Sequence, residues 1–151
     1  MSDIIKTFRE TGLADIPLVG GKNASLGEML TRLSSKGINV PDGFATTAVA
    51  FWNFLDFNQL REKLLQLMQT LDKKNFSNLK DIGQQSRALI LKGEIPQNIK
   101  EEIVTAYRNL CGGEDSAVAV RSSATAEDLP QASFAGQHES FLNIKGEKEL
   151  L

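Results

Sequence analysis

Two basic residues lie in sequence settings that suit phosphate binding. Lys22 follows two glycines in Val19-Gly20-Gly21-Lys22, and Arg121 follows the small apolar run 117–120. Ammonium and guanidinium groups both donate charge-assisted hydrogen bonds to phosphate oxygens, and the glycines allow backbone to approach a ligand closely. These residue types indicate an anion site. The alternative is a solvated lysine in a glycine turn and an ordinary surface arginine.

Hydroxyls and a second glycine loop accompany the arginine. Ser122 and Ser123 come directly after it, and Ser133-Phe134-Ala135-Gly136-Gln137 follows further along the chain. The small residues of this loop, Gly136 above all, would let its backbone close over a ligand. The lysine turn is not a Walker A loop, because the GxxxxGK[ST] spacing is absent.

A helix is expected to begin just after the lysine turn, where apolar residues recur at helical spacing (Leu26, Met29, Leu30 and Leu33). Ser25 with Glu28 forms a capping-box pattern that places the helix start there, and Asn23 is the competing N-cap. A cation such as Lys22 opposes the helix dipole at this end, unless a bound anion faces both the lysine and the helix.

The remaining pattern predicts an α/β (α+β) fold with a helix-rich middle and short strands. Strands are expected around residues 17–19, 44–47, 117–120 and 138–143, the third of them buried and ending at Arg121. Thr46 or Thr47 would cap the helix that follows the second strand. That helix is rich in aromatic residues, which predicts that it lies in the core. Three amphipathic helices fill residues 60–110 as scaffold.

Composition narrows the function classes. The chain has 151 residues, 41% hydrophobic, with a net charge of −2, which favours neither nucleic acid nor an anionic membrane as partner. Its apolar runs are too short to span a membrane, and no targeting segment is recognisable. A single cysteine, Cys111, fits a cytoplasmic protein without internal disulfides. With one cysteine and one histidine, we expect no Cys/His metal site.

Three motifs together resemble a known family. They are VGGKNASLGEM at 19–29, VPDGFATT at 40–47 and AVRSSATAEDLPQASFAGQHESFLN at 119–143. In this order they are similar to the N-terminal part of the phosphoenolpyruvate synthases, the pyruvate, water dikinases. Pyruvate phosphate dikinases and rifampicin phosphotransferases are similar in the same region, and the intact SSATAEDLPQASFAGQ run favours the water dikinase branch.

The resemblance implies an ATP-grasp-like nucleotide-binding domain, in which two α/β subdomains clasp ATP. Residues 1–151 would then be the N-terminal part of a pyruvate phosphate dikinase-type ATP-binding domain. The family's lysine and arginine that contact the ATP phosphates fall on Lys22 and Arg121. The loop Ser133–Gln137 would lie over the phosphates, which makes Gly136 and Gln137 secondary ATP-binding candidates and Ser122 and Ser123 weaker ones.

The resemblance also implies an activity for the complete enzyme. ATP, pyruvate and water become phosphoenolpyruvate, AMP and phosphate through a phosphohistidine, with Mg²⁺, in a step of gluconeogenesis. The second ATP-grasp subdomain with its metal ligands, the phosphohistidine domain and the TIM-barrel domain would lie outside this chain. We therefore expect no catalytic residue and no metal ligand in 1–151, and an inactive fragment whose partners are ATP or AMP and the rest of the polypeptide. His138 does not lie in the phosphohistidine motif.

Other interpretations stay open at this stage. The chain stops about one helical turn after Gly146, which predicts a fragment, yet a stand-alone nucleotide- or phosphate-binding module has the same motifs. The same domain of another dikinase, such as an antibiotic phosphotransferase, is a second option, because the acceptor is chosen elsewhere. A helical interaction domain whose GGK and RSS segments are only turns is a third. The oligomeric state is open, with a homo-oligomer one option for the full enzyme.

Overall fold

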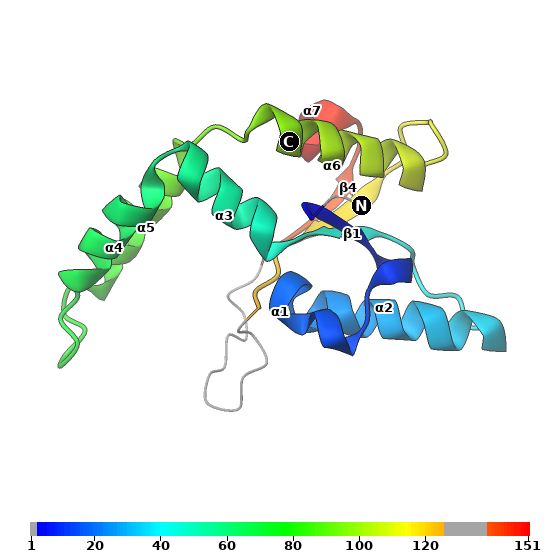
Figure 1. Ribbon diagram of the computed structural model, residues 1–151, viewed down its shortest axis with the longest axis horizontal. Coiled ribbons are helices and arrows are strands. Elements are labelled where there is room, and N and C mark those ends of the chain that lie inside the picture. The colour runs from blue at the N-terminus through cyan, green and yellow to red at the C-terminus, as the bar shows by residue number, and fades with distance from the viewer. Residues whose placement is uncertain (1–2, 126–138) are drawn as a thin grey trace. The chain divides into compact units, whose positions relative to one another are not determined.

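The computed structural model describes residues 3–125 and 139–151. Helices and short antiparallel strands make up this part of the chain, which confirms the α/β (α+β) prediction. The elements are labelled in Figure 1. The chain divides into two compact units. Unit 1 comprises Met1–Ala50 with Asn98–Leu151, and unit 2 comprises Phe51–Gln97.

Unit 1 contains a first two-stranded antiparallel sheet. Strand β1 (Ile5–Thr7) pairs with β2 (Phe44–Thr46), and β2 confirms the strand predicted around 44–47. Helix α3 (Ala48–Phe57) follows β2 after one residue. The hydroxyl of that residue, Thr47, accepts a hydrogen bond from Ala50 N at 3.4 Å, so Thr47 rather than Thr46 caps the helix.

The segment before the lysine turn is helical. Two short 3₁₀ helices, η1 (Phe8–Glu10) and η2 (Leu13–Asp15), lead into α1 (Ile16–Val19). The strand predicted around 17–19 is therefore wrong. Pro17 lies in the first turn of α1, where its fixed φ is already helical and its missing N–H removes no intrahelical hydrogen bond.

The main helix of unit 1, α2 (Gly21–Leu33), begins earlier than predicted and continues into η3 (Ser34–Lys36). Gly20 is its N-cap residue, and Ala24 N donates to Gly20 O at 3.1 Å. The predicted starts at Asn23 and Ser25 are wrong. Glu28 is used elsewhere than in a capping box: its Oε1 accepts from Leu13 N at 3.3 Å, and its Oε2 accepts from Arg32.

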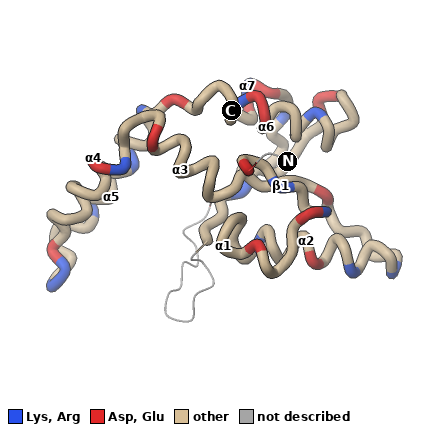
Figure 2. Tube along the Cα trace, viewed as in Figure 1, with Lys and Arg blue, Asp and Glu red and all other residues tan. Residues whose placement is uncertain are grey.

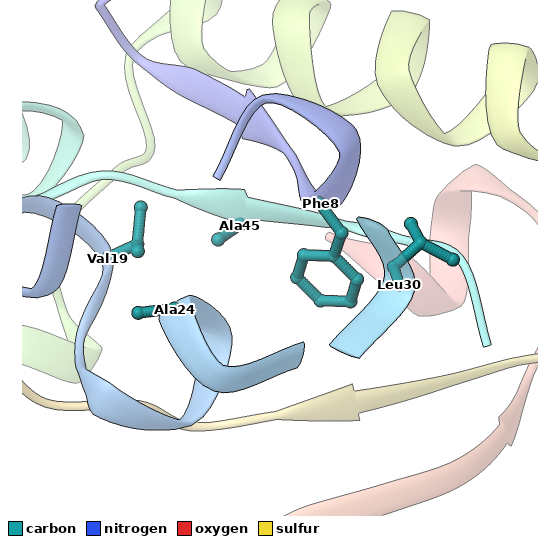
Figure 3. Close-up of a cluster of buried hydrophobic side chains, with 5 residues drawn as sticks. All are labelled: Phe8, Val19, Ala24, Leu30 and Ala45. Atoms are coloured by element: carbon teal, nitrogen blue, oxygen red, sulfur yellow. The ribbon is translucent and has the colours of Figure 1, made fainter. Parts of the chain in front are cut away.

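The core of unit 1 lies between α2 and the first sheet. Figure 3 shows its five buried side chains, Phe8, Val19, Ala24, Leu30 and Ala45. Gly27 lets α2 pack directly on the preceding loop, because a Cβ there would lie 2.2 Å from Thr11 O. This close packing fixes α2, and with it the turn at its N-terminus, against the rest of the unit.

A second antiparallel sheet carries the arginine motif. Strand β3 (Val118–Arg121) pairs with β4 (Ser140–Ile144), and Arg121 lies opposite Ser140. Both predicted strands are thus present, but β3 is not buried: Val118 and Val120 are half-buried while Ala119 and Arg121 are exposed. Helix α6 (Gln97–Leu110) precedes this sheet, and α7 (Glu147–Leu150) confirms the helical turn expected after Gly146.

Unit 2 contains two of the predicted amphipathic helices, α4 (Leu60–Gln69) and α5 (Leu79–Leu91), which lie side by side (Figure 1). The third predicted amphipathic helix is α6. The aromatic-rich helix α3 is less buried than predicted, since Phe51 and Trp52 are 48% and 47% exposed. Arg61 covers the Trp52 ring instead, its guanidinium carbon 4.5 Å from the ring centroid. Unit 2 contains neither the lysine turn (residues 19–22) nor the arginine segment (residues 121–124).

Candidate phosphate-binding site

The lysine turn and the arginine segment meet in unit 1. The Ser123 hydroxyl donates a hydrogen bond to Val19 O at 3.0 Å, across 104 residues of sequence. Gly20 faces the same segment so closely that a Cβ there would lie 2.4 Å from Ser123 Oγ and 2.7 Å from Ala124 O. The two motifs that were singled out for phosphate chemistry are therefore held together by backbone and side-chain contacts.

Lys22 lies in the first turn of α2, where the helix dipole is positive. Helical N–H groups at residues 21–23 precede the first intrahelical acceptor, because the first 5→1 hydrogen bond is that of Ala24 N to Gly20 O. In α2, which the structure describes throughout, the first turn holds no acidic residue. The ammonium group of the exposed Lys22 is disfavoured beside the positive end of the α2 dipole. An anion bound at this end would interact favourably with both.

Arg121 is the last residue of β3 and is exposed to solvent. The next residue, Ser122, ties this end of β3 to the residue before β4. Its backbone N–H donates to Glu139 O at 3.1 Å, and its Oγ accepts from Glu139 N at 2.9 Å. Arg121 is thus carried on a backbone that is held to β4 through Ser122 and to the lysine turn through Ser123.

Four of the six predicted site residues, Lys22, Arg121, Ser122 and Ser123, lie in these two adjoining segments. Gly136 and Gln137, with the rest of the loop Ser133–Gln137, lie outside the described residues, as does His138. Sequence reasoning missed the role of Asn23, whose Nδ2 donates to Val19 O at 2.7 Å. Its only sequence signal was its place after a glycine turn, which we interpreted as an N-cap.

Lys22, Arg121 and the N–H groups at the start of α2 are hydrogen-bond donors, which is the kind of group that an anion accepts from. Among residues 3–125 and 139–151, no three His, Cys, Asp or Glu side chains are grouped to hold an ion. Figure 2 shows acidic and basic residues interspersed along the trace of both units. The candidate phosphate-binding groups are therefore local ones, Lys22, Arg121 and the start of α2.

Two hollows of the surface lie away from these motifs. One, of about 470 Å³, is an open groove between α4 and α5 in unit 2. The other, of about 270 Å³, lies in unit 1 beside Lys6, Leu18 and Thr47. Neither is lined by a residue of the lysine turn or of the arginine segment, so we place the candidate site on the surface where those two segments meet.

Comparison with known proteins agrees with the motifs. Residues 16–151 match the family model described as the pyruvate phosphate dikinase AMP/ATP-binding domain. This match includes the whole of α2 and both strands of the second sheet. The chain belongs to this family. The lysine turn and the arginine segment are therefore parts of an AMP/ATP-binding domain, which confirms the resemblance drawn from the sequence.

Individual relatives of the chain are phosphoenolpyruvate synthases, in agreement with the family match. The chain is 49% identical over 148 residues to a phosphoenolpyruvate synthase of Synechocystis, with 93% of this chain and 18% of that protein covered. It is 46% identical over 149 residues to one of Deinococcus radiodurans, covering 99% and 19%. For the phosphoenolpyruvate synthase of Escherichia coli the identity is 44% over 146 residues, covering 96% and 18%. The chain thus spans about a fifth of the length of these relatives.

The helices of this family member are short. In the ranges that the structure describes, none is both long and apolar enough to cross a membrane.

Proposed function

We propose that this chain is the ATP-binding part of a phosphoenolpyruvate synthase, a cytoplasmic enzyme that converts ATP, pyruvate and water to phosphoenolpyruvate, AMP and phosphate. The observation that carries the proposal is the hydrogen bond from Ser123 to Val19 O, at 3.0 Å. It joins the two motifs that carry Lys22 and Arg121, in a chain whose relatives are named for this activity.

In this proposal the chain's own residues bind and orient the phosphates. The Lys22 ammonium and the Arg121 guanidinium donate hydrogen bonds to phosphate oxygens, and the N–H groups at the start of α2 face the same anion. Phosphoryl transfer depends mainly on such positioning and on neutralising charge that develops in the transition state. Gly136 and Gln137 are further proposed contacts, on the loop that would cover the phosphates.

Magnesium enters the proposal together with ATP. Mg²⁺ prefers carboxylate and phosphate oxygens, and the first turn of α2 carries no carboxylate. The first turn of α2 therefore offers no carboxylate ligand for the ion, and we propose that its protein ligands lie outside this chain. Pyruvate and the phosphohistidine belong to other domains in this proposal.

The test starts from the native polypeptide that carries this sequence. Its intact mass shows its length, and its reaction with ATP and pyruvate shows the activity. We expect AMP and phosphate to form beyond one equivalent per enzyme only when pyruvate is present, because pyruvate must accept the phosphoryl group from the phosphohistidine before the next turnover. AMP formation that ignores pyruvate but requires another acceptor would identify a different dikinase, and ATP binding without any turnover would identify a non-catalytic module.

Binding is then measured by calorimetric titration with ATP and with adenosine. A charge-assisted hydrogen bond contributes about 1.5–3 kcal/mol, so Lys22→Ala and Arg121→Ala should each weaken ATP binding about 10- to 100-fold. Adenosine, which lacks phosphates, should bind both variants as it binds the wild type. Lys36→Ala, at the exposed far end beyond α2, is the matched control. Unchanged ATP affinity in both site variants would remove Lys22 and Arg121 from the site.

A further inference from the structure

The contact between the two motifs depends on the hydroxyl of Ser123 and on the lack of a Cβ at Gly20. Val19 O accepts from Ser123 Oγ at 3.0 Å and from Asn23 Nδ2 at 2.7 Å. Gly20 has φ +81°, a conformation that residues with a side chain rarely adopt. A Cβ at that position would also overlap Ser123 Oγ, which it would approach to 2.4 Å.

The hydrogen-bond inventory of Ser123 limits what this residue can do. A serine hydroxyl has one proton, and that of Ser123 is directed at Val19 O. Phosphate oxygens of ATP at neutral pH are acceptors, so they need donors from the protein. Ser123 therefore has no proton for a phosphate while it is bonded to Val19.

We infer that Ser123 and Gly20 form a clasp that positions Lys22 and Arg121 for one shared phosphate group, and that Ser123 is a positioning residue and not an ATP ligand. The inference rests on the proposed nucleotide site. It replaces the direct phosphate contact expected for Ser123. Arg121 sits just before the clasp on one segment, and Lys22 just after it on the other.

The clasp acts by preorganisation. Without it, two segments 104 residues apart in sequence must be ordered when the nucleotide binds, and that ordering weakens affinity. The loss of one neutral hydrogen bond corresponds to about a 2- to 10-fold weaker binding of ATP. Adenosine affinity should stay unchanged, because the clasp orders only the groups that face the phosphates.

The first experiment compares Ser123→Ala with Ser123→Thr, which keeps a hydroxyl. We expect ATP affinity to fall about 2- to 10-fold in the alanine variant and to return in the threonine variant. In nucleotide-free protein, the Val19 carbonyl carbon should shift its NMR signal in Ser123→Ala and not in Ser123→Thr. An unchanged Val19 signal in the alanine variant would show that the bond is absent in solution and would overturn the clasp.

The second experiment separates the clasp from simple backbone strain. Gly146 has φ +78° and ψ 166°, close to the φ +81° and ψ 160° of Gly20. A Cβ added there would approach only the side chain of Asp115, at 3.3 Å, so Gly146→Ala carries a similar backbone strain without the overlap with Ser123. Only Gly20→Ala should weaken ATP binding. If both variants weaken it equally, strain explains the effect and the clasp is wrong.

A double-mutant cycle distinguishes positioning from direct contact. If Ser123 acts through the clasp, Ser123→Ala adds almost nothing once Gly20→Ala has separated the segments. If Ser123 touched phosphate, the two losses would multiply, which would contradict the inference. Should Gly20→Ala not fold, the Val19 signal and the threonine rescue decide alone. If the wild type binds no ATP, the proposed function fails and the clasp loses its role, while the Val19 signal still reports the bond itself.

Discussion

The backbone N–H of Gly146 donates a hydrogen bond to the phenol oxygen of Tyr107 at 2.9 Å, across 39 residues of sequence. The same hydroxyl donates to Ser116 O at 2.7 Å. Tyr107 is completely buried. One side chain of α6 therefore holds both the segment that enters β3 and the turn that leaves β4, so it supports the sheet that carries Arg121.

Tyr107→Phe should destabilise unit 1 while leaving its packing nearly unchanged. The change removes one donor and one acceptor and leaves Gly146 N and Ser116 O without this partner, which costs about 1–3 kcal/mol. Urea unfolding followed by circular dichroism measures the loss. Ser116→Ala is the control, since the acceptor is a backbone oxygen that survives this change. An equal loss in both variants would show that the hydroxyl is not what stabilises the sheet.

The packing of α2 on its preceding loop leads to a second prediction. Gly27→Ala should destabilise unit 1 by about 1–3 kcal/mol, because the new methyl group would overlap Thr11 O, 2.2 Å away, and Phe8 O, 2.8 Å away. Gly83→Ala is a matched change within α5, where nothing lies within 4 Å. It should stabilise its helix by about 0.5–1 kcal/mol. The two urea midpoints should therefore move in opposite directions, and a shift of both in one direction would contradict the prediction.

Acid should remove part of the stability through Asp15. The Lys6 ammonium, and after it the Gly12 N–H at 2.9 Å, hold the pKa of Asp15 below its ordinary 3.8. The unfolded chain thus takes up this proton more readily than the folded protein, so the stabilisation is present above pH 3.8 and is lost as the pH falls through the folded pKa.

Asp15→Asn tests this dependence. The variant should be less stable than the wild type near neutral pH, by at most about 1 kcal/mol for a partly exposed pair. The difference should shrink as the pH falls from about 5 to about 2. Asp72, whose pKa is lowered chiefly by Ser77, is common to both proteins, so its effect cancels in the subtraction. A difference that stays constant over this range would rule out the Asp15 pKa shift as its source.

Local sequence signals predicted most of the elements. Helical periodicity located α4, α5 and α6, because the apolar residues of each recur at helical spacing, although in α4 and α5 only Leu60 and Ile82 are buried. Capping and turn residues also predicted where helices begin: Thr47 caps α3, and Gly146 precedes α7. The wrong predictions concern residues that match a local pattern but are used in other contacts in the folded protein. Ser25 and Glu28 match a capping box, but the carboxylate of Glu28 binds Leu13 and Arg32 instead.

The candidate site residues were chosen by residue type, whereas the contacts that bring their segments together could not be predicted from local sequence. Lys22 and Arg121 stand out as cations beside glycines and hydroxyls. No local rule distinguishes Ser122, which bonds Glu139, from Ser123, which bonds Val19. That choice depends on contacts across 104 residues of sequence, and these arise only when the lysine turn packs against the end of β3.

The identity of the cation at position 121 gives the last prediction. Arg121→Lys keeps the charge but loses the planar fork that binds two phosphate oxygens at once. Its ATP affinity should therefore lie between those of the wild type and Arg121→Ala. Raising the salt concentration should weaken ATP binding to the wild type and to Arg121→Lys by a similar factor, and to Arg121→Ala by less, because screening acts on the charge and not on the fork. If Arg121→Lys binds ATP as the wild type does, Arg121 acts as a point charge alone. If its salt dependence instead matches that of Arg121→Ala, position 121 does not face the phosphates, since a lysine there would then have no anion to attract.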